Sequence, residues 1–173
     1  MKVDVTSIIR DHLRTLYNAR TGKSSLGDAV IFFLLPALAG GFSFLLKFSV
    51  AQEFYNVSIT FFGIFIALLL NIQVAIFAIF QRKWDLPKDK KLAEIAFEKM
   101  TSRNLLLKEL NANISYLVLF CCAALLVAVV FYVLKWSAWV APSFVVIMYS
   151  HFFFTLIMIV KRSHALFQME YSA

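Results

Sequence analysis

Three polar side chains lie inside otherwise apolar runs of this sequence and are its main candidates for chemistry: Asn71, Gln73 and His151. An ionisable group inside a membrane-spanning helix is costly, so His151, about midway along its run, is a candidate for proton or ion transfer. A neutral histidine can also hydrogen-bond between packed helices, with Asn71 or Gln73 as its partner, and we favour this structural role. Asn71 and Gln73 point about 200° apart on a helix, so only one of them can face the axis of an oligomeric pore.

Two other motifs match catalytic or binding signatures only in part. The adjacent Cys121 and Cys122 point about 100° apart on a helix, so a disulfide between them is not expected. The segment Arg20–Ser25 contains Gly-Lys-Ser, but Tyr17 stands where a phosphate-binding loop needs glycine. No carboxylate or second histidine shares the depth of His151, which argues against ion-coupled transport and against a metal site. The sequence therefore predicts no enzyme, no cofactor and no metal.

Composition and charge indicate a membrane protein. Hydrophobic residues make up 61% of the chain and charged residues 16%, against roughly 45–50% and 25% in soluble domains, and the apolar residues are clustered. Of the 17 Lys and Arg residues, five precede Asp28, eight lie in 81–112 and two follow Val160, while Lys47 and Lys135 flank short turns. Basic residues collect on the cytoplasmic side of membranes, which accounts for the net charge of +7 without direct binding of nucleic acid.

We therefore predict an all-α integral membrane protein with a single domain and four transmembrane helices in the lipid bilayer. Both termini are expected on the cytoplasmic side of the membrane. The predicted spans are residues 28–50, 57–80, 114–134 and 141–160. The predicted cytoplasmic segments are an amphipathic lead (1–27), a helical hairpin loop (81–113) and a tail (161–173) that frays after a short helical extension. Asp28 is expected to cap the first span.

Small residues in the first two spans predict close helix packing. Pro36 should kink the first span, while Gly40 and Gly41 let another helix approach. The second span carries a stripe of small or polar residues at four-residue spacing, which predicts an assembly face with an interhelical hydrogen bond from its asparagine. The members of this stripe are Gly63, Ala67, Asn71 and Ala75.

Two helices are predicted outside the bilayer. Residues Val3–Tyr17 form an amphipathic helix that lies in the headgroup plane, packs on a partner, or covers this protein's own cytoplasmic end. No Gly or Pro occurs between Pro87 and Pro142, so a single helix is expected over Lys88–Trp136, roughly 70 Å long. About half of it would stand in the cytosol as a docking surface for a soluble protein, with Lys90, Lys91, Lys99 and Arg103 as the docking residues.

The amphipathic lead, the Arg20–Ser25 turn, the four spans and the basic loop from Arg82 to Lys108 resemble the membrane subunit of Kiwa-type bacterial antiviral (anti-phage) defence systems. The resemblance implies a homo-oligomer in the inner membrane that senses infection, with a nucleic-acid-binding cytosolic protein docked on it. We therefore predict an oligomeric sensor or scaffold subunit. The alternative is an oligomeric pore or membrane-disrupting effector that acts without a catalytic partner.

Overall fold

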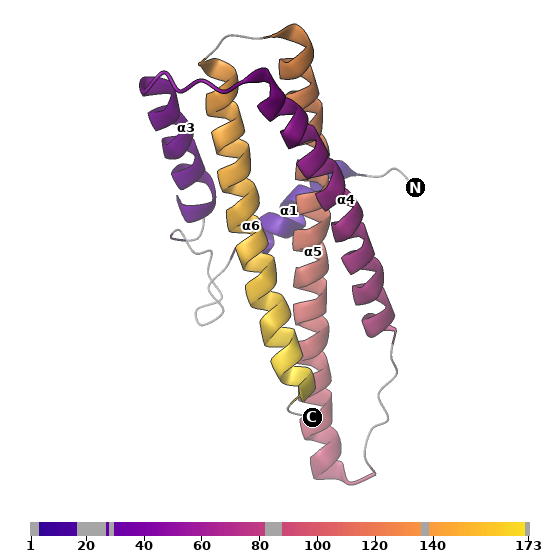
Figure 1. Cartoon of the computed structure of the whole chain (residues 1–173). Helices are drawn as coiled ribbons and strands as arrows, with labels where there is room; N and C mark the ends of the chain where they lie inside the picture. Colours follow the sequence, from indigo (N-terminus) through magenta and orange to yellow (C-terminus); the bar gives the residue numbers. More distant parts are fainter. Residues whose placement is uncertain (1–3, 17–26, 28–29, 82–87, 136–138, 172–173) are drawn as a thin grey trace.

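The computed structural model describes residues 4–16, 27, 30–81, 88–135 and 139–171, and every regular element in them is helical. The elements are α1 (Val5–Thr15), the π-helical turn η1 (Val30–Leu34), α3 (Leu35–Leu45), α4 (Gln52–Phe80), α5 (Lys90–Leu134) and α6 (Val140–Tyr171) (Figure 1). The predicted all-α class is confirmed. Asp28, the predicted cap of the first span, lies outside the described residues.

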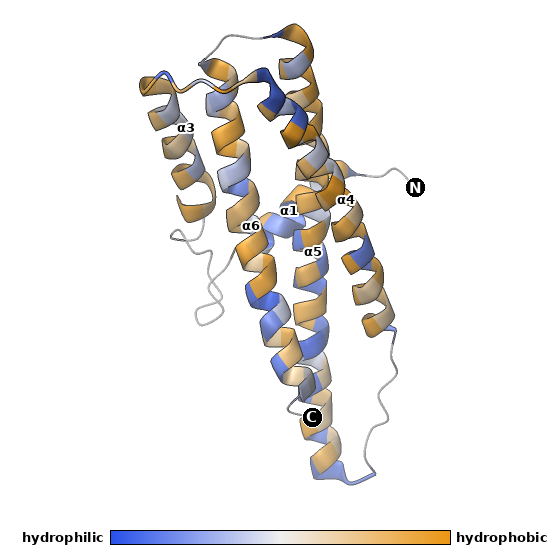
Figure 2. Ribbon diagram, in the orientation of Figure 1, coloured by the Kyte–Doolittle hydropathy of each residue, from blue (hydrophilic) through white to orange (hydrophobic). Residues whose placement is uncertain are grey.

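Three helices, α4, α5 and α6, are long and apolar enough to cross a membrane. Their apolar residues share one end of the molecule, whereas hydrophilic residues gather along the far parts of α5 and α6 (Figure 2). The first predicted span is shorter than expected, since its apolar helix covers Val30–Leu45, about 24 Å. A hydrocarbon core is about 30 Å thick, so the fourth span stays a prediction.

Helix α5 is continuous over 45 residues, which confirms the prediction of a single long helix. It begins at Asp89, whose carboxylate accepts hydrogen bonds from the amides of Lys91 and Leu92, and it ends at Lys135 in the left-handed conformation. At 1.5 Å per residue it measures about 67 Å, more than twice the hydrocarbon thickness. Its first turns extend well past the end of α4 (Figure 1).

The helices follow the order α3, α6, α5, α4 in space. Backbones are close between α3 and α6, between α6 and α5, and between α5 and α4, and no such contact joins α3 to α4 within the described residues. Helices α4 and α6 meet instead through aromatic rings, among them Phe61 and Phe152 at 5.3 Å between centroids. Because the layer is not closed, α3 and α4 each keep an outer side on which no other described helix packs.

Buried apolar residues recur every seven residues on all three long helices, a pattern typical of coiled-coil packing. On α4 they are Tyr55, Phe62, Leu69 and Ile76, and on α6 they are Val145, Phe152, Ile159 and Leu166. Helix α5 carries the full alternation of three and four in Leu107, Leu110, Ile114, Leu117, Cys121, Ala124, Ala128 and Phe131. Cys121 is thus a buried packing residue and Cys122 is exposed, both as free thiols.

Two helices extend beyond the predicted spans. Helix α4 begins at Gln52 rather than residue 57, and α6 continues to Tyr171, so most of the predicted tail is helix. In place of a simple kink, a π-helical turn over Val30–Leu34 precedes Pro36. Proline has no amide hydrogen to donate to the carbonyl of Phe32, so the regular ladder cannot continue through this turn.

Candidate functional site

Of the two adjacent glycines, only Gly40 is needed for close packing. A Cβ atom there would overlap Cγ1 of Ile147 and lie 3.0 Å from the carbonyl oxygen of Ser143, both on α6. At Gly41 nothing lies within 4 Å of such an atom. Gly40 therefore lets α3 and α6 approach, as predicted, whereas Gly41 faces open space.

The predicted stripe on α4 is not part of the packing within the chain. Ala67, Asn71 and Ala75 are exposed, and the Cβ position of Gly63 makes only an ordinary 3.9 Å contact. The interhelical hydrogen bonds expected from Asn71 come instead from Gln73, whose amide donates to Asn111 at 3.2 Å and to Ser115 at 2.8 Å on α5. As predicted, the two amides face different ways.

His151 is buried and both of its ring nitrogens are hydrogen-bonded. Nδ1 lies 2.9 Å from the carbonyl oxygen of Phe32, and because that oxygen only accepts, Nδ1 carries the proton. Nε2 then accepts from the hydroxyl of Tyr116 at 2.8 Å. The partners are therefore Phe32 and Tyr116 rather than the expected Asn71 or Gln73. The Phe32 carbonyl is the one that Pro36 cannot serve, so His151 supplies its donor from α6.

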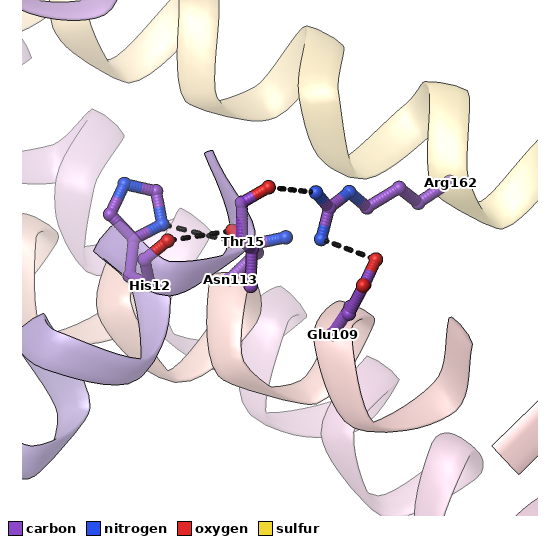
Figure 3. Close-up of polar contacts among 5 residues, drawn as sticks. All are labelled: His12, Thr15, Glu109, Asn113 and Arg162. Atoms are coloured by element: carbon purple, nitrogen blue, oxygen red, sulfur yellow. Dashed lines mark hydrogen bonds and ion pairs between the residues drawn. The ribbon is translucent and has the colours of Figure 1, made fainter. Parts of the chain in front are cut away.

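A second polar group, which we call the junction cluster, joins α1 to α5 and α6. It consists of His12, Thr15, Glu109, Asn113 and Arg162 (Figure 3). Nδ1 of His12 lies 2.8 Å from Oδ1 of Asn113, and the hydroxyl of Thr15 lies 2.7 Å from the same oxygen. The ring of His12 also stacks on Tyr116 with 3.8 Å between centroids, so the junction cluster adjoins the His151 site.

Arg162 closes the junction cluster from α6. Its guanidinium donates to the carbonyl oxygen of Thr15 at 2.6 Å and forms an ion pair with Glu109 at 3.0 Å. The Thr15 carbonyl belongs to the last turn of α1, where a cation is favourable. Arg162 thus joins the end of α1 to α5 and α6.

Burial lowers the pKa of His12 from about 6.5 to about 4. Its side chain is fully enclosed, and desolvation of the charged ring is the largest cause, with smaller contributions from His151 and Arg162 and an opposing one from the bond to Asn113. The site therefore holds a neutral histidine near pH 7.

Only part of the predicted docking set lies on the surface. Lys90 and Lys91 are exposed and Lys99 is half-buried, whereas Arg103 is only 3% exposed and donates to the carbonyl oxygen of Ile79 at 2.8 Å. Arg103 thus binds the last turn of α4, so its assignment as a docking residue is corrected. The same stretch exposes large apolar side chains that we had not singled out, namely Leu92, Ile95 and Phe97.

Helix α1 packs on α5 mainly through polar residues, and of its apolar stripe only Leu16 is buried among the described residues. His12 and Thr15 are buried, while Val5, Ile9 and Leu13 remain 40–46% exposed. The helix therefore packs on this protein's own α5 near Asn113, and its exposed apolar side chains could enter a headgroup layer, as also predicted.

Comparison with protein-family models, with curated proteins and with solved structures finds no match to this chain. Within the described residues, no three His, Cys, Asp or Glu side chains are grouped as metal ligands would be.

Proposed function

We propose that this chain is an oligomeric inner-membrane subunit that docks a soluble cytosolic protein on the free part of α5, as a sensor or scaffold. The supporting observation is the stretch of α5 beyond α4, where three apolar side chains are more than half exposed. These are Leu92 (55%), Ile95 (62%) and Phe97 (57%). Exposed apolar residues beside charged ones are typical of a protein interface.

The charges of this stretch favour a protein partner over nucleic acid. Lys90, Lys91 and Lys99 flank Glu94 and Glu98, so the surface carries both signs. A purely electrostatic site for a phosphate backbone would need a continuous basic face. The antiviral role stays a prediction that depends on the resemblance given above.

Assembly into a homo-oligomer is supported by the outer side of α4. Asn71 is exposed between Ala67 and Ala75 on a helix apolar enough to span a membrane. An amide facing lipid lacks partners, and a second copy would provide them. The alternative function as a pore has less support, because both nitrogens of His151 and the amide of Gln73 are engaged inside the chain. Of these three candidates, Asn71 alone has no such partner within the described residues.

The docking proposal is tested by purifying the tagged protein in mild detergent and weighing what accompanies it. The double variant Lys90→Glu, Lys91→Glu should lose a soluble partner that the unchanged protein retains, since it reverses two exposed charges at the start of α5. The matched control, Lys90→Arg with Lys91→Arg, keeps both charges and should keep the partner. Equal recovery of the partner with all three proteins would refute docking at this surface.

A further inference from the structure

A groove runs between the end of α4 and the adjoining turns of α5. It has a volume of about 540 Å³, within the range of ligand sites. One wall is apolar, from Ile76, Phe77 and Phe80 on α4. The other, on α5, combines Leu105 and Leu107 with the polar residues Asn104, Lys108 and Asn111, and we call it the polar wall. Phe77 and Phe80 are both more than half exposed, so the apolar wall is accessible from outside the chain.

Two polar bridges between α4 and α5 frame this groove. At one end Arg103 donates to the carbonyl oxygen of Ile79, and at the other Gln73 donates to Asn111 and Ser115. Residues Asn104, Lys108, Asn111 and Ser115 are spaced by four, three and four, so they share one side of α5. The helices are therefore fixed to each other on both sides of the opening.

The polar wall offers donors and a positive charge that the chain does not neutralise. Within the described residues, neither an ion pair to Lys108 nor a hydrogen bond to the Asn104 side chain is formed. Oδ1 of Asn111 accepts from Gln73, which leaves its amide hydrogens to donate elsewhere. One ammonium and two amide groups along one groove suit a phosphate.

The groove lies at the depth of the lipid headgroups. Lys108 precedes Ile114, where the apolar run of α5 begins, by six residues, or about 9 Å along the axis. Ile76 and Phe77 belong to the apolar part of α4, which ends at Phe80. Because Ile79 lies beside Arg103 and Gln73 beside Asn111, both walls cross the headgroup layer together, with Phe80 at its outer side and Ile76 deeper.

We propose that this groove binds an anionic phospholipid. The phosphate lies at the outer end of the groove against Lys108 and the amide of Asn104, and one acyl chain runs inward from Phe80 past Phe77 and Ile76. This inference is independent of the proposed docking function, since it concerns the bilayer surface rather than the free part of α5. Basic pockets between helices at a membrane surface are typical of such lipid sites.

The test is native mass spectrometry of the detergent-purified protein after addition of phosphatidylglycerol or of phosphatidylcholine with the same acyl chains. The unchanged protein should retain one phosphatidylglycerol in preference to phosphatidylcholine. Lys108→Gln should lower this retention about tenfold, because a hydrogen-bonded charge pair is lost. The matched control is Lys161→Gln, which removes an exposed lysine from α6 and should leave retention unchanged.

Circular dichroism of both variants checks that they fold, and a second variant tests the apolar wall. Phe77→Ala should lower the retention of both lipids, because it shortens the surface that the acyl chain covers. Equal retention of the two lipids by the unchanged protein, or equal losses in Lys108→Gln and Lys161→Gln, would overturn the proposal. A polypeptide found in the groove by cross-linking from position 108 would overturn it as well.

Discussion

His12 and Arg162 secure α1 by two different means. Arg162 keeps its charge because Glu109 pairs with it and the Thr15 carbonyl accepts from it. His12 has no carboxylate partner among the contacts described, and burial keeps its ring neutral, while the bond to Asn113 and stacking on Tyr116 hold the ring in place. Attachment of α1 should therefore depend on pH through His12.

The expected pH dependence follows from the lowered pKa of His12, about 4 against 6.5 when exposed. Below pH 6.5 the undocked helix takes up a proton that the docked helix does not, so docking weakens as pH falls towards 4. At pH 5 the loss should be about 2 kcal/mol. Hydrogen-exchange protection of the α1 amides at pH 8 and pH 5 measures it.

The control for this prediction is the exposed His164 on α6. His164→Gln should keep the loss of protection at low pH, whereas His12→Gln should abolish the pH dependence. If the unchanged protein protects α1 equally at both pH values, His12 does not control its docking.

Several of these residue roles were not predicted from the sequence, for identifiable reasons. Arg103 could have been recognised as buried, since it lies three residues after Met100 and four before Leu107 in the register of the α5 core. His12 could not, because its partner Asn113 is 101 residues away and a buried polar contact leaves no periodic signal. The partners of His151 depend on the π-helical turn before Pro36, which spacing alone does not reveal.

Among the described glycines, Gly40 makes the closest contact with another helix, where α3 packs on α6. The added Cβ of Gly40→Ala would overlap Ile147 and press on the Ser143 carbonyl, so α3 would have to move. We expect a loss of about 1–3 kcal/mol in stability, measured by thermal unfolding in detergent. Gly41→Ala has open space and better helix propensity, so it should unfold at the same temperature or higher. Equal destabilisation by the two variants would contradict the packing of α3 on α6.

The long helices were predictable because apolar clustering and the lack of Gly and Pro are both local features that the sequence shows directly. The continuous α5 and its alternating core spacing follow directly from those features. The short first helix was not predicted. Composition shows where the chain is apolar, but it does not show that a π-helical turn precedes this helix or that the left-handed Lys47 follows its end.

Charge and apolar surface divide the molecule into two parts. One end, marked by Lys47 against the ring of Trp139, has few charges, and the other carries the free part of α5 and the basic side chains. The positive-inside tendency then predicts that the basic end faces the cytosol, where a soluble partner would dock. The proposed docking requires this orientation, and the proposed assembly and lipid binding require that the helices lie in a membrane.

Cysteine labelling in intact cells tests the orientation most directly. With Cys121 and Cys122 replaced by alanine, Ile95→Cys on the exposed part of α5 should react with a membrane-impermeant maleimide only after the cells are permeabilised. Trp139→Cys, at the opposite end of the spans, should react in intact cells and serves as the control. Labelling of position 95 in intact cells would contradict the membrane arrangement and any cytosolic role built on it.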